Sequence, residues 1–194
     1  WNTIAQEESV PEISKIIKNR KGSEIELFGL IGKTEKFTRF ASGINEFDRV
    51  CGEGLTHGST TLICGDPGIG KSTLLLQILG KLANKTSCIY ISGEESVDQI
   101  RQRASRLGLL KTKVKLASAT NVNDLTTTLT KHPNKKVVVI DSIQTMFVES
   151  VDSSPGTISQ VRSSAQELIL LAKNFEFAMI LVGHVTKEGN IAGP

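Results

Sequence analysis

The segment GDPGIGKST, residues 65–73, combines glycines, a lysine and hydroxyl residues at a spacing that suits phosphate binding. It matches the pattern G-x-x-x-x-G-K-[ST] and lies between an apolar run and a helical pattern, a context that a chance glycine turn would not need. Glycines let backbone N–H groups face phosphate oxygens, Lys71 adds a mobile cation with a catalytic role, and Ser72 offers a hydroxyl to Mg²⁺. We predict that ATP with Mg²⁺ binds here, through Gly65, Asp66, Pro67, Gly68, Ile69, Gly70, Lys71, Ser72 and Thr73.

Carboxylates end two other apolar runs. VVVID places Asp141 where it can hold Mg²⁺ through water opposite Ser72, although an aspartate can also simply end a strand. YISGEES ends with Glu94 and Glu95, and hydrolysis needs a group that orients or deprotonates water. Either glutamate could instead complement the macrodipole of the following helix. We predict that one of them is catalytic and favour Glu94, which lies nearer the strand end.

A histidine and a basic run are weaker candidates. The run ILVGH brings His184 to the carboxyl end of the last predicted strand, where open α/β sheets bind ligands. His184 either senses the γ-phosphate or only hydrogen-bonds backbone. The basic run has no acidic residue and either meets phosphodiester or, as its spread around the helix favours, forms a solvated surface. It comprises Arg101, Arg103, Arg106, Lys111, Lys113 and Lys115.

Composition excludes several classes of protein. The 194 residues carry a net charge of +3 and are 39% hydrophobic, which is ordinary for a folded domain. No apolar run approaches the roughly 18 residues of a membrane span, and the N-terminus does not resemble a signal peptide. Cys51, Cys64 and Cys88 form no metal-binding pattern, so we predict reduced, mostly buried thiols in a cytoplasmic protein without a membrane partner.

Short β-branched runs alternate with helical patterns from residue 60 onward, which predicts an α/β fold with a mostly parallel, twisted sheet and helices on both faces. Residues 1–40 lack sustained periodicity and are predicted to be an N-terminal extension, with the core at 41–194. The predicted strands are Thr60–Cys64, Cys88–Ser92, Val114–Leu116, Val137–Ile140 and Ala178–Val182. The predicted helices are Lys71–Leu82, Val97–Leu107, Asn123–Lys131 and Thr157–Asn174, the last with an apolar face of Ile158, Val161, Ala165, Leu168, Ile169 and Ala172.

The chain also resembles a known class of ATPase. This chain resembles the entry to RecA-type, P-loop NTPase cores in the stretch FASGINEFDRVCGEGLTHGSTTLICGDPGIGKSTLLLQ. The chain is similar to one family in that class, the bacterial DNA repair proteins called RadA or Sms. The segments that carry this similarity are YISGEES, VVVIDSIQTM, SSPGTISQVRSSAQELILLAK and ILVGHVTKEGNIAGP. The resemblance covers about residues 37–194.

This resemblance implies a DNA-dependent ATPase of recombinational repair that drives branch migration on single-stranded and branched DNA as a hexameric ring, alongside the recombinase RecA. Glu94 would then activate water, and His184 would be the phosphate sensor. Residues 149–156 and 185–194 would form the DNA-binding loops. The family's zinc module would precede Trp1 and further motifs would follow Pro194, so zinc is expected only outside this chain and the core is expected to be truncated.

Two other functions stay open. A KaiC-like regulatory ATPase with protein partners and no DNA would suit the phosphate loop and the GEES turn equally well. A nucleotide-binding scaffold that hardly hydrolyses ATP is the other alternative, and the truncated core itself could behave in that way. A small-molecule kinase is less favoured, because the sequence shows no arginine-bearing lid.

Overall fold

A computed structural model describes residues 26–31, 39–132, 134 and 136–185 of the chain. The chain divides into two compact units, residues 1–35 and 36–194. Within the first unit, the described residues 26–31 form no helix or strand. No helix in the described part of the chain is long and apolar enough to cross a membrane.

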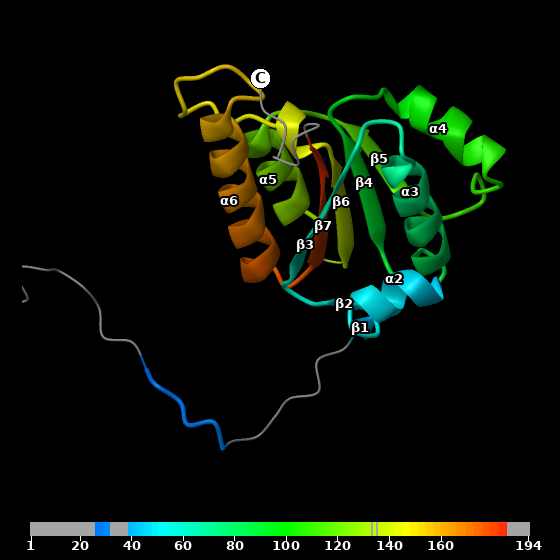
Figure 1. Cartoon of the computed structure of the whole chain (residues 1–194), viewed down its shortest axis with the longest axis horizontal. Helices are drawn as coiled ribbons and strands as arrows, with labels where there is room; N and C mark the ends of the chain where they lie inside the picture. The colour runs from blue at the N-terminus through cyan, green and yellow to red at the C-terminus, as the bar shows by residue number, and fades with distance from the viewer. Residues whose placement is uncertain (1–25, 32–38, 133, 135, 186–194) are drawn as a thin grey trace, which may run out of the picture. The chain divides into compact units, whose positions relative to one another are not determined.

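The second unit is built on a five-stranded sheet in which neighbouring strands are parallel. The order across the sheet is β3-β7-β6-β4-β5. The chain forms the edge strand β3 first, continues through β4 to the other edge strand β5, and returns through β6 to β7 (Figure 1). The strands are β3 (Thr60–Gly65), β4 (Cys88–Ser92), β5 (Lys115–Ser118), β6 (Val137–Asp141) and β7 (Ala178–His184). Their carboxyl ends therefore meet at one edge of the sheet, where the predicted site residues follow β3, β4, β6 and β7.

Helices cover both faces of this sheet (Figure 1). On one face, α3 (Lys71–Leu82) and α4 (Val97–Arg106) bury Leu75 and Ile100 against strand residues such as Val139. On the other face, α5 (Val122–Thr130) and α6 (Ile158–Asn174) bury leucines such as Leu168 against the alternate strand residues. Strands with two covered faces require continuous apolar runs, which explains the composition of β6 and β7.

Short elements complete the second unit. A two-stranded antiparallel sheet joins β1 (Arg39–Phe40) to β2 (Leu55–Thr56), with the helix α2 (Asn45–Val50) between them. A 3₁₀ turn, η1 (Ile143–Thr145), follows β6 directly after a cis peptide bond between Asp141 and Ser142. This turn lies at the edge of the sheet that carries the predicted site.

The predicted fold class is confirmed, and every predicted strand and helix is present within two residues of its expected end. The apolar face predicted for α6 is partly wrong. Ile158 and Ile169 are exposed, whereas the buried stripe contains Gln160, Ser164, Leu168 and Leu171. The polar Gln160 is accommodated in this stripe because its carboxamide bonds the backbone of Val148 and of the following turn.

Cysteine burial is also only partly as predicted. Cys88 on β4 is fully buried, and Cys51 is partly exposed. Cys64 is exposed because β3 is the edge strand of the described sheet, a position that its apolar sequence does not reveal. Among the described residues, no group of three or more His, Cys, Asp and Glu could hold a metal ion.

Candidate active site

The phosphate loop joins β3 to α3 as the sequence predicts. Gly68 and Gly70 adopt positive φ values of 77° and 101°, and Gly70 is the N-cap of α3 in the left-handed conformation. No side chain caps the first turn of α3, so its backbone N–H groups face the loop without a capping oxygen. A helix N-terminus of this kind is an anion-binding site, because its unpaired N–H groups carry partial positive charge.

Lys71, the first residue of α3, curls back over the loop. Its ammonium donates to the carbonyl oxygens of Gly65 (2.7 Å) and Asp66 (2.8 Å) and lies 3.2 Å from Nδ1 of His184. The residue is only 8% exposed. The cation is therefore held by dipoles at the edge of the loop, within reach of an anion that could replace them.

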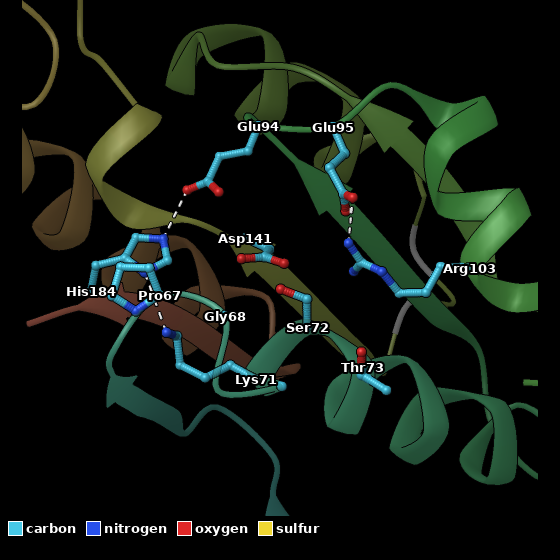
Figure 2. A pocket seen from close by; sticks show the side chains of 11 residues that line it. Pro67, Gly68, Lys71, Ser72, Thr73, Glu94, Glu95, Arg103, Asp141 and His184 are labelled. Carbon is cyan, nitrogen blue, oxygen red and sulfur yellow. Dashed lines mark hydrogen bonds and ion pairs between the residues drawn. The ribbon is translucent and has the colours of Figure 1, made fainter.

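Asp141 lies at the floor of the site and is 3% exposed. The buried hydroxyl of Tyr90 on β4 donates to Oδ2 of Asp141, a partner that no sequence motif indicates. Burial raises the pKa of Tyr90 and the charge of Asp141 raises it further, so the phenol stays a donor at neutral pH. Asp141 accepts this hydrogen bond directly beside the start of α3 (Figure 2).

Ser72 and Asp141 fit a magnesium ion bound together with phosphate. Both offer hard oxygen atoms, and both line the same pocket. Mg²⁺ typically takes one or two protein ligands and completes its shell with water and substrate phosphates, so the absence of a larger acidic cluster in the described residues is expected.

The GEES turn places the two glutamates. Ser92 at the end of β4 is fully buried, and its hydroxyl accepts hydrogen bonds from the backbone N–H groups of Glu94 (3.1 Å) and Glu95 (2.9 Å). A Cβ atom on Gly93 would lie 2.0 Å from the hydroxyl of Thr145 in η1, so the turn can approach η1 only with glycine there. The backbone is thereby fixed, and the two side chains diverge from it.

Glu94 points toward the histidine side of the pocket (Figure 2). Its Oε1 accepts a hydrogen bond from Ser142 (2.5 Å) and lies 3.0 Å from Nε2 of His184. Burial raises the pKa of Glu94, but the hydrogen bonds from Ser142 and His184 and the charge of Lys71 outweigh it, so the pKa lies below its ordinary value. Glu94 is therefore a carboxylate at neutral pH.

Glu95 points the other way and forms an ion pair with Arg103 of α4. The side chains are 27% and 18% exposed respectively, so the pair is partly withdrawn from solvent. This corrects the interpretation of the basic run as a solvated surface, which holds for the other five residues but not for Arg103. The helical spacing gives only a weak signal, because Arg103 lies three residues after the buried Ile100 on the same helix.

These groups line one pocket of about 300 Å³ at the carboxyl edge of the sheet. It brings together most of the predicted residues and adds Arg103: the lining is Pro67, Gly68, Gly70, Lys71, Ser72, Thr73, Glu94, Glu95, Arg103, Asp141 and His184. Gly65 and Asp66 do not line it but bind the Lys71 ammonium through their carbonyl oxygens. Ile69 does not line it either and is 69% exposed.

His184 links the two main groups of the pocket. Its ring lies between the Lys71 ammonium and the Glu94 carboxylate, and its backbone carbonyl accepts a hydrogen bond from Gln144 of η1 (3.1 Å). It is therefore more than a strand-end histidine bound only to backbone. Of the two predicted DNA loops, residues 149–156 form turns anchored by Gln160, whereas 186–194 lie outside the described residues.

The fold and this pocket define a RecA-like P-loop ATPase core. A DnaB-like replicative helicase, in a structure with primase, has the same fold, with a TM-score of 0.66 over 79% of this chain and 45% of that one at 16% identity. The family model described as "ATPase: KaiC" matches residues 40–135. These matches confirm the fold class expected from the motifs.

Relatives at higher identity lie among the DNA repair proteins RadA. Those of Brucella abortus and Pseudomonas aeruginosa are 48% and 45% identical across the whole of this chain. The chain spans 44% and 43% of their lengths. The chain belongs to the RadA family, as the sequence motifs indicated.

Proposed function

We propose that this chain is the ATPase core of a DNA-dependent ATPase of recombinational repair. The observation that carries the proposal is the pocket itself, in which the phosphate loop, Asp141 and the pair Glu94 and His184 meet at one sheet edge. The RadA relatives, which are named as DNA repair proteins, support the biological role. Movement on single-stranded or branched DNA, ring assembly and cooperation with a recombinase are part of this proposal.

Nucleotide binding begins with the exchange of partners at Lys71. The ammonium leaves the carbonyl oxygens of Gly65 and Asp66 for the β and γ phosphates, which are charged and therefore stronger acceptors. The free N–H groups at the start of α3 bind the same phosphates. Ser72 and Asp141 would hold Mg²⁺, which neutralises charge on the phosphate oxygens when it is bound.

Glu94 orients the attacking water in this mechanism. Its carboxylate is ionised, faces the pocket and is held by Ser142 and His184, so one oxygen is fixed in direction. A carboxylate with a lowered pKa is a weak base, so Glu94 acts mainly by positioning the water while the transferred phosphoryl group departs. Glu95 is neutralised by Arg103 and is the weaker candidate for this role.

His184 senses the γ-phosphate in this mechanism. In the structure its ring bridges Lys71 and Glu94, and Lys71 changes partners when ATP binds. The backbone of His184 is tied to Gln144 and leads directly into residues 185–194, which we propose to be one of the DNA-binding segments. Occupancy of the phosphate site would therefore change the conformation of that segment.

A second candidate function is a regulatory ATPase with protein partners. It is favoured by the match of residues 40–135 to the KaiC family model, because that stretch contains both the phosphate loop and the GEES turn. DNA affinity separates the two functions, since contacts to DNA phosphates weaken by several decades between about 50 and 200 mM salt.

The test is ATP hydrolysis by the intact protein with and without single-stranded DNA, at about 50 and 200 mM salt. We expect DNA to stimulate hydrolysis and the stimulation to fade at the higher salt concentration. The Lys71→Ala protein is the control, because its loss of hydrolysis assigns the activity to this pocket. Hydrolysis that is indifferent to DNA at both salt concentrations would instead support the regulatory ATPase.

A further inference from the structure

Arg103 is set apart from its basic neighbours by its position. The side chain extends from α4 into the pocket that contains Ser72 and Thr73 and meets Glu95 there (Figure 2). Arg101 and Arg106 on the same helix are exposed, and Arg101 pairs with Asp98 at the surface. An ion pair that served only to stabilise α4 would not need to lie beside the phosphate loop.

The hydrogen bonds of Arg103 support a role beyond packing. Its Nη2 group pairs with Glu95, whereas Nη1 is buried and has no hydrogen-bond partner in the described part of the chain. A buried donor without a partner costs free energy, and an arginine turned toward solvent would avoid that cost. The inward orientation is therefore explained better by what the charge does in the pocket.

The charges that line the pocket give that explanation. Lys71 and Arg103 are the cations, and three carboxylates oppose them: Glu94, Glu95 and Asp141. The nucleotide adds further negative charge, so each carboxylate left unpaired beside the phosphates weakens binding.

We propose that Arg103 is a positioning residue of the nucleotide site, which neutralises Glu95 and holds that carboxylate away from the bound phosphates. This inference rests on the proposed function of the pocket as an ATPase site. Arg103 acts through Glu95 rather than by contact with the nucleotide. Glu94 is left as the carboxylate that is free to orient water, so the ion pair separates the tasks of two adjacent glutamates.

The proposal predicts that one substitution rescues another. In the intact protein without DNA, we expect Arg103→Gln to weaken binding of a fluorescent ADP with Mg²⁺ about tenfold, the size expected for one charge in a partly solvated pocket. The double variant Arg103→Gln with Glu95→Gln removes both charges and should bind within about threefold of the wild type. Arg106→Gln, which removes an exposed arginine from the same helix, should bind like the wild type.

Two further measurements separate a charge effect from a folding effect. Arg103→Lys keeps the charge and should lie within about threefold of the wild type in affinity. In ATP hydrolysis, Arg103→Gln should raise KM more than it lowers kcat, and the effect should shrink as salt screens the unpaired carboxylate. Thermal unfolding of each variant shows whether any loss of binding follows from loss of structure.

The inference is overturned if Arg103→Gln binds as tightly as the wild type. It is also overturned if the double variant stays as weak as Arg103→Gln, because Arg103 would then act on the nucleotide directly or on the fold. These outcomes are distinct from failure of the proposed function. Rescue of ADP binding would stand even if hydrolysis proved indifferent to DNA, since the binding assay contains no DNA.

Discussion

The two sides of the pocket begin from the same turn and end in different environments. On the histidine side, Glu94 joins Ser142 and His184, and His184 in turn meets Lys71, so hydrogen bonds connect groups that follow β4, β6 and β7. On the arginine side, Glu95 meets Arg103 in a partly buried ion pair. Adjacent identical residues can thus have different roles, because their neighbours decide which charge is available.

The cause of this difference is the backbone between the two side chains. The Ser92 hydroxyl fixes both N–H groups, and Gly93 allows the turn to lie against η1. The side chains then diverge, Glu94 toward His184 and Glu95 toward Arg103 (Figure 2). The histidine side contains Lys71, which must exchange carbonyl oxygens for phosphates, whereas the charges of the arginine side are already paired. Substitutions on the two sides should therefore affect different steps.

The largest expected effect is that of Glu94→Gln on turnover. The amide keeps the shape of the side chain but cannot hold an ionised oxygen toward water, so we expect kcat to fall about 10³-fold with nucleotide affinity within about threefold. Glu95→Gln should keep kcat within about fivefold. Steady-state hydrolysis and nucleotide binding by the intact protein measure both. A protein that loses turnover with Glu95→Gln and keeps it with Glu94→Gln would reverse the comparison.

The next largest effect concerns Lys71, whose ammonium contacts His184 on the histidine side before ATP binds. Lys71→Ala removes the buried cation that exchanges carbonyl oxygens for phosphates, so we expect nucleotide affinity to fall about 100-fold. Titration of a fluorescent ATP analogue measures the loss, and Lys85→Ala, an exposed lysine beyond the same helix, is the matched control. Equal affinities of Lys71→Ala and wild type would remove Lys71 from the site.

A smaller effect is expected at Asp141, which forms the floor of the pocket that both sides share. Tyr90→Phe deletes a buried hydroxyl that donates to Asp141 and leaves the ring in place. Without that donor the Asp141 carboxylate loses its fixed direction, and we expect the Mg²⁺ concentration for half-maximal ATP binding to rise about fivefold. Affinity for ATP at saturating Mg²⁺ should change less. An unchanged Mg²⁺ requirement would show that Tyr90 serves only the core.

The sequence predicted the elements and the phosphate loop well because both depend on local patterns. Continuous apolar strands such as Val137–Asp141 reveal burial on two faces, and the helix Lys71–Leu82 has the bounds expected from its own periodicity. Asp141 and His184 were placed at the site because carboxyl ends of parallel strands share one edge of the sheet.

Features that depend on contacts between distant segments were not predictable in the same way. The Tyr90 hydroxyl and Asp141 are 51 residues apart, and Tyr90 had the appearance of an ordinary strand residue. Arg103 was grouped with exposed basic residues, although its side chain is turned into the pocket by its position on α4. The exposure of Cys64 depends on strand order, which no local pattern contains.

The smallest effect is one of pH on folding stability, and it again concerns the histidine side. The pKa of Glu94 in the folded protein lies below its ordinary value of about 4.5, so its carboxylate stabilises the fold above that pH. This contribution is lost as pH falls through the lowered pKa. Glu94→Gln should therefore be less stable than wild type at pH 7, with the difference shrinking below about pH 4.5.

Denaturant unfolding of the two proteins at pH 7, 5 and 4 measures this difference. We expect a small effect, because the Glu94 side chain is 41% exposed and solvent screens its partners. Glu46→Gln is a surface control, since the pKa of Glu46 is lowered only by its hydrogen bond with Arg49 on an exposed helix. A difference that grows toward acid pH would mean that burial outweighs Ser142 and His184, and that Glu94 is a stronger base than the mechanism requires.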